Sequence, residues 1–218
     1  MTGPAAPQRA AYRRGLPVAW LAMTSDAAPG IGPEVDLLRN WLDPAAASLL
    51  FDTLHATLPW QVHRVRMFGR EFDSPRRSCW IGDPDAAYRY SGVRHEPHPW
   101  PAVLLPLRER LTRETGVAFN SVLANLYRDG RDCMGWHSDD EPELGERPVI
   151  ASLSLGATRR FLLRHRRDPS RRHALDLPHG SLLLMQGDTQ AHWRHALPRT
   201  ARPVAPRINL TFRRIGPA

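Results

Sequence analysis

The sequence contains no lysine, and all 30 of its basic side chains are arginine. With 22 acidic residues, the formal net charge is +8 and the isoelectric point is about 10.8. Arginine codons favoured by a GC-rich genome are one explanation. Arginine also binds carboxylates and phosphates bidentately, and a strongly basic chain of this size is a candidate nucleic-acid-binding protein. Composition leaves both explanations open.

Cysteine and long apolar runs are also scarce. The two cysteines, Cys79 and Cys133, lie far apart and do not form a metal-binding pair, which favours a reduced compartment and a cytoplasmic location. No run of 18 apolar residues exists, so we expect no membrane span and no membrane partner. The length of 218 residues and the hydrophobic fraction of 42% suit one folded domain, which we expect to be a monomer.

Residues 1–30 are rich in alanine, proline and glycine. We predict a flexible N-terminal extension there, followed by a single domain over residues 31–218. Residues 12–27 combine two arginines with an apolar stretch, a weak likeness to a signal peptide, but the stretch is short and contains Pro17. A translation start upstream of the true one is a further alternative.

Two regions of the chain have helical features. Residues 33–60 carry apolar side chains at helical spacing and predict one or two helices. Within them, Asp43 and Pro44 are typical of a helix N-cap and of the first helical position. Residues 101–116 predict another helix, which ends at Gly116. Between these regions, residues 62–68 alternate in polarity like a strand.

Short strand-like segments dominate the second half of the chain, with glycine, proline and aspartate between them. They cover residues 119–127, 148–156, 159–165, 173–178, 180–187, 192–198 and 207–215. Such a series is typical of a β-sandwich or barrel. The fold class that we expect is mainly β with N-terminal helices (α+β).

One short motif, GWHSDDE, combines ligands that a metal ion could share. On a strand, His137 and Asp139 would project to the same face. A non-haem Fe(II) site needs such a pair and a second histidine. His192 and His195 are candidates, but they are three residues apart and would face opposite sides of a strand, so only one of them can be the ligand. The spacing does not decide which, and an exposed polar turn is the alternative for the whole motif.

The segment PRINLTFRR presents a second arrangement, suited to an anion. Arg207, Asn209 and Arg213 would share one face of a strand, while the apolar residues between them need burial on the other face. Asn125 and Tyr127 form another pair with hydrogen-bonding tips on one face. An exposed basic edge strand is the alternative, but two occupied faces favour an anionic ligand inside the fold.

Several motifs occur together in a characteristic order. They are N-x-Y-x-x-G, W-H-S-D-D-E, S-L-S-x-G-A-T-R, H-G-S-L-L-x-M, H-x-x-P and P-R-x-N-L-T-F-R. Over roughly residues 60–215 this order resembles the AlkB family of Fe(II)/2-oxoglutarate dioxygenases, and above all its DNA-repair branch. The resemblance implies a double-stranded β-helix, or jelly-roll, over about 117–215 and a nucleotide-recognition region over about 61–95. The cofactors that it implies are Fe(II), 2-oxoglutarate and O2.

The resemblance also assigns the candidate site. His137, Asp139 and His195 would be the catalytic residues that hold iron, with His195 selected by the H-x-x-P motif. Arg207 would pair with one carboxylate of 2-oxoglutarate and Arg213 with the other. The residues that complete that pocket would be Asn125, Tyr127 and Asn209.

The implied substrate is DNA carrying 1-methyladenine or 3-methylcytosine, demethylated with release of formaldehyde, succinate and CO2. The alternatives are the same chemistry on RNA, tRNA or a small metabolite, and a catalytically silent nucleic-acid-binding module. Tyr88, Tyr90 and Ser91 would line the base pocket, and Glu141 would contact the exocyclic amine of the damaged base.

Four more residues have expected roles near the substrate or the site. Phe68 would enter the gap left by a flipped base, with an ordinary core position as the alternative. Arg76 would contact the substrate, and Arg159 would reach a phosphate from the arginine-rich segment 159–173. Asp140 would either orient an arginine such as Arg207 or be solvated.

Overall fold

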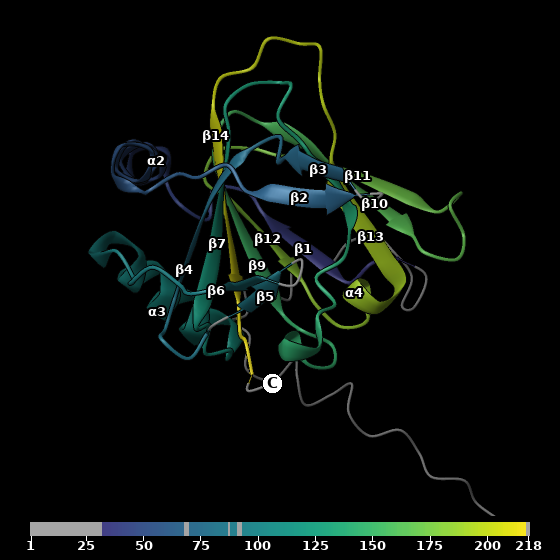
Figure 1. Ribbon diagram of the computed structural model, residues 1–218, viewed down its shortest axis with the longest axis horizontal. Helices are drawn as coiled ribbons and strands as arrows, with labels where there is room; N and C mark the ends of the chain where they lie inside the picture. The colour runs from purple at the N-terminus through teal and green to yellow at the C-terminus, as the bar shows by residue number, and fades with distance from the viewer. Residues whose placement is uncertain (1–31, 68–69, 87, 91–92, 217–218) are drawn as a thin grey trace, which may run out of the picture.

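A computed structural model describes residues 32–67, 70–86, 88–90 and 93–216 (Figure 1). For residues 65–67, 70–71, 88–90 and 93–95 it describes the backbone alone. The expectations for Phe68, Ser91 and the N-terminal extension lie outside the described residues.

A six-stranded antiparallel sheet, the major sheet, runs through the centre of the fold. Its strands, in spatial order, are β1 (Val35–Leu38), β12 (Ser181–Met185), β9 (Ile150–Gly156), β14 (Arg207–Arg213), β7 (Ser121–Tyr127) and β4 (Arg77–Gly82). β14 lies between β9 and β7 and pairs with both along most of its length. The anion motif predicted on this strand is therefore at the middle of the sheet.

A four-stranded antiparallel sheet, the minor sheet, contains β11 (Arg172–Leu177), β10 (Arg159–His165), β13 (Trp193–Leu197) and β8 (Met134–His137), in that order. Two separate hairpins are formed by β2 (Arg64–Met67) with β3 (Arg70–Asp73) and by β5 (Tyr88–Tyr90) with β6 (Val93–His95). The fold is thus mainly β, as predicted, and its sheets are antiparallel.

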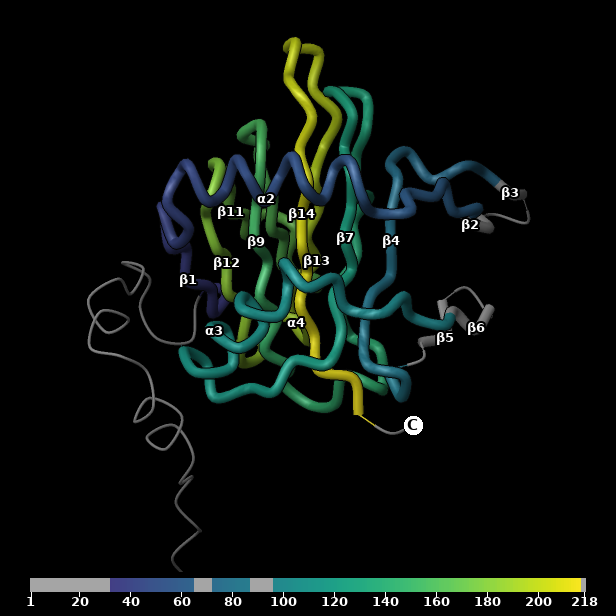
Figure 2. Tube along the Cα trace, turned by 90° about the vertical axis from the view of Figure 1, so that its left-hand side faces the viewer, coloured from purple at the N-terminus to yellow at the C-terminus, as the bar shows by residue number. Residues whose placement is uncertain are grey.

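Helices α2 (Pro44–Thr57) and α3 (Leu105–Thr115) lie across one face of the major sheet (Figure 2). Among the described residues, the short elements are two 3-10 turns, η2 (Ala102–Leu104) and η3 (Pro142–Leu144), and the one-turn helix α4 (Thr189–His192). In the described part of the chain, no helix is long and apolar enough to span a bilayer.

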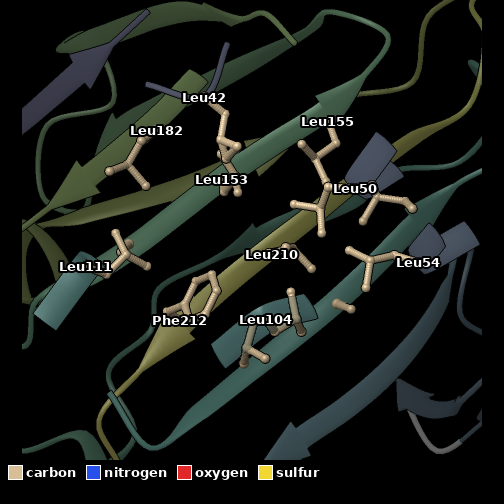
Figure 3. Packing of buried hydrophobic residues seen from close by; sticks show 14 of the residues in the cluster. Leu42, Leu50, Leu54, Leu104, Leu111, Leu153, Leu155, Leu182, Leu210 and Phe212 are labelled. Carbon is tan, nitrogen blue, oxygen red and sulfur yellow. The ribbon is translucent and has the colours of Figure 1, made fainter. Parts of the chain in front are cut away.

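Two hydrophobic clusters hold these layers together. The first fills the space between the helices and the major sheet, and it includes Leu54 of α2, Leu111 of α3 and Leu210 of β14 (Figure 3). The second contains residues of both sheets, among them Leu183 of β12 and Phe161 of β10. One face of the major sheet is therefore covered by helices and the other by the minor sheet.

Most of the predicted elements are confirmed. The Asp43 side chain accepts hydrogen bonds from the backbone N–H groups of Ala45 and Ala46, so it caps α2. Gly116 ends α3 with φ of 74°, a left-handed conformation that glycine adopts without strain. The seven strands predicted between residues 119 and 215 appear as β7 and β9 to β14, and the strand predicted over 62–68 appears as β2.

The helical prediction for residues 33–42 is wrong. Val35–Leu38 forms β1, which pairs with β12 so that Val35 stands opposite Met185. Apolar residues at positions 35 and 38 fit a helix and a short strand equally well. The outcome is decided by β12, which is 150 residues away in the chain and pairs with this segment along its edge.

Candidate metal centre and anion pocket

A polar pocket lies between the two sheets. The major sheet contributes Asn125, Tyr127, Ser152, Met185, Arg207, Asn209, Thr211 and Arg213 to its lining; the remaining lining residues are Met134, His137, Asp139, Phe161, His195 and Leu197. The pocket thus contains all three predicted metal ligands and all five residues predicted for 2-oxoglutarate.

Antiparallel pairing brings the metal ligands together. His137 on β8 stands directly opposite His195 on β13, and their Nε2 atoms are 3.1 Å apart. Asp139 follows two residues after His137, with Oδ2 4.0 Å from Nε2 of His195. One potential ligand atom from each of the three side chains lies within 4.8 Å of the other two. Among the described residues, no other group of three such side chains lies this close together.

The surroundings of these side chains fit a metal ion. Nδ1 of His137 donates to the backbone carbonyl of Gly135 over 2.8 Å, which leaves the lone pair of Nε2 directed at His195. Oδ2 of Asp139 is buried without a hydrogen-bond partner, an arrangement that is costly unless a cation binds there. Two imidazoles and one carboxylate are the donor set of non-haem Fe(II) sites.

Burial and charge set the protonation of the ligands. Burial would raise the pKa of Asp139, but Arg213 and the two histidines outweigh it and hold that pKa at about 2. Burial, together with the proximity of His137, lowers the pKa of His195 to about 3. The carboxylate is therefore ionised and the His195 imidazole neutral, the states in which both bind metals.

Arg213 lines the pocket, where the resemblance placed it, and it also contacts a metal ligand. Its Nη2 donates a hydrogen bond of 2.6 Å to Oδ1 of Asp139. The resemblance had assigned this guanidinium to a carboxylate of 2-oxoglutarate. That assignment stays a prediction, whereas the ion pair with Asp139 is a contact that the sequence did not indicate. Arg213 thereby orients the carboxylate so that Oδ2 points to the metal position.

Two further side chains support the metal ligands, and the sequence did not reveal them. Oε1 of Gln190, on α4, accepts a hydrogen bond of 2.9 Å from the backbone N–H of Asp139. Oγ of Ser138 donates to the carbonyl of Trp193 over 2.8 Å. The segment 190–195, which carries His195, therefore also holds the loop that carries Asp139. No local pattern marks Gln190, because its partner is 51 residues away.

Arg207 fits the predicted role in binding an anion. It is 1% exposed, and its Nη2 donates to Oγ of Ser154 and to Oδ1 of Asn209. Its guanidinium also lies 5.3 Å from the ring centre of Tyr127. Among the described residues no carboxylate lies within ion-pair distance of it, and burial lowers its pKa to about 10. A buried guanidinium without a counter-charge is costly, so the pocket suits an anionic ligand.

Both faces of β14 are occupied, as predicted. On the pocket side, Asn209 accepts from Ser152 over 3.1 Å and donates to Thr211 over 2.7 Å. On the other side, Ile208 and Leu210 are fully buried in the cluster beneath the helices. Ser152 and Thr211 were missed as pocket residues, although their alternation with apolar neighbours could have indicated them.

The remaining predicted residues lie around this centre. His192 ends α4, is exposed and does not belong to the ligand cluster. Nε of Arg76 donates to Oδ1 of Asn125 over 2.9 Å, which places Arg76 beside the pocket. Glu141 is half-buried and precedes η3. Tyr88 and Tyr90 both belong to β5, of which the backbone is described.

The phosphate contact expected of Arg159 is wrong. Arg159 is 3% exposed, and its guanidinium donates to the backbone carbonyls of Asp129, Asp132 and Pro198. These bonds join the loop after β7 to the loop after β13, and they leave the side chain enclosed by the protein.

Asp140 forms an ion pair with Arg166 in the loop between β10 and β11. This partner differs from Arg207, the arginine considered from the sequence. Asp140 is exposed, so the pair adds at most modest stability, but it connects the loop of the metal ligands to the β10–β11 hairpin.

Known proteins of similar sequence support the same interpretation. The chain is 40% identical over 192 residues to human alpha-ketoglutarate-dependent dioxygenase alkB homolog 3, a match that covers 84% of this chain and 66% of the relative. It is 40% identical over 221 residues to DNA oxidative demethylase ALKBH2 of Bos taurus, which covers 97% of this chain and 78% of that relative. The chain thus spans about two thirds of the length of the alkB homolog 3 proteins that it matches.

The fold has a counterpart among solved structures. OsALKBH1 superposes with a TM-score of 0.57 at 20% identity, covering 83% of this chain and 98% of that one. This likeness concerns the fold alone. The family model of the 2OG-Fe(II) oxygenase superfamily matches residues 34–213, the range that contains both sheets and the pocket. The chain therefore belongs to the 2OG-Fe(II) oxygenase superfamily, whose Fe(II), 2-oxoglutarate and O2 are the cofactors that this pocket suits.

Proposed function

We propose that the protein is an Fe(II)- and 2-oxoglutarate-dependent dioxygenase that oxidatively demethylates N-alkylated bases, such as 1-methyladenine and 3-methylcytosine, in DNA. One observation carries the proposal: a 2-His-1-carboxylate cluster and a buried arginine without a counter-charge line the same pocket. Relatives at about 40% identity that are named DNA oxidative demethylase support the substrate.

We assign His137, Asp139 and His195 as the metal ligands and Arg207 as the partner of one 2-oxoglutarate carboxylate. Asn125, Tyr127, Asn209 and Arg213 line the same pocket and are the remaining contacts proposed for the cosubstrate. Arg213 also orients a metal ligand, because its Nη2 donates to Oδ1 of Asp139. A bound dianion would neutralise the buried positive charge of Arg207. The free-energy cost of burying that charge in the ligand-free protein therefore favours cosubstrate binding.

With Fe(II), 2-oxoglutarate and O2 bound, the site would supply an oxidant that inserts one oxygen atom of O2 into a C–H bond of the N-methyl group, while the other oxygen atom enters succinate as 2-oxoglutarate loses CO2. The hydroxymethyl group would then lose its hydroxyl proton to water and leave as formaldehyde, and the electron pair of the broken C–N bond would stay on the base nitrogen. The chain's part is to position the methyl group beside the metal and to exclude water with the apolar lining, Phe161, Met185 and Leu197.

The base must leave its stack to reach a pocket between two sheets. We assign base contacts to Tyr88, Tyr90, Ser91 and Glu141, a flanking contact to Arg76 and the wedge to Phe68. The net charge of +8 supports a polyanionic partner. The proposal includes a double-stranded β-helix core over about 117–215, a recognition region over about 61–95, a monomeric state and a cytoplasmic location.

The test is direct. Purified protein is incubated with Fe(II), 2-oxoglutarate, ascorbate and an oligonucleotide that carries one 3-methylcytosine, as single strand, as duplex and as RNA. Mass spectrometry should show the loss of one methylene mass per repaired base and stoichiometric succinate. The loss in RNA but in neither DNA form would reassign the substrate. No loss in any form, with intact binding, would identify a silent binding module.

Phe68 has its own comparison. If its ring fills the gap of the flipped base, Phe68→Ala should reduce repair of the duplex more than repair of the single strand. Equal reduction of both would place Phe68 in the core instead.

A further inference from the structure

The outer face of the minor sheet carries a row of arginines. Arg164 on β10 stands opposite Arg172 on β11 and opposite Arg194 on β13. Directly opposed residues in an antiparallel sheet project to the same face. His195, the neighbour of Arg194, lines the pocket, so the three arginines point away from it.

These charges lack acidic partners. Arg172 donates to the backbone carbonyl of Pro169, and Arg194 is exposed. An acid on this face, Asp176, lies 3.4 Å from another arginine, Arg160. In the described part of the chain, no carboxylate comes within ion-pair distance of the three arginines of the row. Like charges directly opposite each other destabilise a sheet, so a bound polyanion would relieve a repulsion that the fold maintains.

An exposed tryptophan lies beside this row. Trp136 is 38% exposed, and the guanidinium of Arg164 is 4.4 Å from its ring centre. Trp136 immediately precedes the metal ligand His137 on β8, which is the edge strand of the minor sheet. The indole and the metal position are therefore on opposite faces of one edge strand, and a ligand that passes over this edge meets both.

We propose that Trp136, Arg164, Arg172 and Arg194, which we call the Trp136 surface, bind single-stranded nucleic acid next to the damaged base. An unpaired base stacks on the indole, and the arginines contact phosphates. An aromatic side chain among cations is the combination with which proteins bind single strands, because every base offers a π-face. Paired bases in a duplex keep their faces covered. The inference rests on the proposed function, and it adds a strand preference and the residues responsible.

The first test measures stacking. A fluorescein-labelled oligonucleotide of about 15 nucleotides, with one 3-methylcytosine, is titrated as single strand and as duplex with protein loaded with Mn(II) and 2-oxoglutarate, so that no turnover occurs. Trp136→Leu should weaken single-strand binding about tenfold, whereas Trp136→Phe, which keeps an aromatic ring, should stay within about threefold of wild type. Binding by Trp136→Leu equal to wild type would overturn the proposal.

The second test measures phosphate contacts. Arg164→Gln and Arg194→Gln should each lower the slope of log affinity against log salt by about 0.7, the value for one phosphate contact on a single strand. The matched control is Arg113→Gln, an exposed arginine on α3, across the major sheet from the Trp136 surface. Unchanged slopes in both test variants would contradict the arginine contacts.

A different occupant would be visible in the same preparations. If the free wild-type protein is a dimer by light scattering and Trp136→Leu converts it to a monomer, the surface joins two copies of the chain and the proposal fails.

The proposed function and the Trp136 surface fail separately. If the iron-loaded wild type does not demethylate DNA but its binding of single strands depends on Trp136, the proposed function is wrong and the Trp136 surface stands. If Trp136→Leu demethylates DNA normally and binds single strands as wild type does, the Trp136 surface is wrong and the proposed function stands.

Discussion

Nη2 of Arg213 donates a hydrogen bond of 2.6 Å to Oδ1 of Asp139, while Oδ2 of the same carboxylate lies 4.0 Å from Nε2 of His195. One oxygen is thus held by the end of β14, and the other is left for the metal. The arginine is 74 residues away from its partner in the chain. The geometry of the metal centre therefore depends on contact between the two sheets.

Removing this contact should weaken metal binding. We expect Arg213→Met to lower the affinity for Mn(II) about tenfold or more, the usual effect of losing a partner that orients a ligand. Isothermal titration of the 2-oxoglutarate-free protein measures it. Arg214→Met, at an exposed neighbouring position, is the control and should bind as wild type does. Equal affinity in both variants would show that Asp139 keeps its orientation unaided.

Arg207 should lower the stability of the ligand-free protein while it increases the affinity for 2-oxoglutarate. Because its guanidinium is buried without a counter-charge, Arg207→Met should leave the melting temperature of the ligand-free protein unchanged or raised. The same variant should bind 2-oxoglutarate at least about a hundredfold more weakly. Thermal unfolding with and without 2-oxoglutarate shows both effects, since a ligand that binds only the folded state raises its stability.

Arg202→Met, in the exposed loop before β14, provides the comparison and should keep the full stabilisation by 2-oxoglutarate. A 2-oxoglutarate shift in Arg207→Met equal to that of wild type would place the anion elsewhere.

Gln190 should act through the backbone of Asp139. Gln190→Met retains the volume but leaves the N–H of Asp139 without its acceptor, so Mn(II) affinity should fall about tenfold. Gln186→Met also loses an amide, one that donates to Asp36 outside the ligand cluster, and should leave Mn(II) affinity intact. If the two variants differ in melting temperature but not in metal affinity, Gln190 is structural only.

The choice between two nearby histidines can be checked directly. His195→Ala should abolish Mn(II) binding, whereas His192→Ala should retain it, because His192 is exposed at the end of α4. Loss of binding in both variants would mean that α4 itself, rather than its imidazole, is needed for the site.

Local patterns in the sequence predicted much of this architecture. Alternation along 207–213 indicated a strand with a polar and an apolar face, and Ile208 is buried as expected while Arg207 faces the pocket. The cap at Asp43 and the stop at Gly116 were predicted because both depend on the residue itself.

The predictions that were wrong concern residues whose partners lie far away in the chain. Val35–Leu38 became a strand because β12 offered an unpaired edge. Arg159 sits beside a basic run and was expected to be exposed, but three carbonyls from two loops enclose it. The choice of His195 came from the resemblance to a family, since spacing alone left two histidines open.

The direct opposition of His137 and His195 has a consequence for folding. Side chains alternate along a strand, so a slip of one residue between β8 and β13 would turn one imidazole away from the other. A metal ion bound by both imidazoles stabilises this alignment of the two strands and no other. Metal binding should therefore favour folded chains whose minor sheet has formed in the correct register.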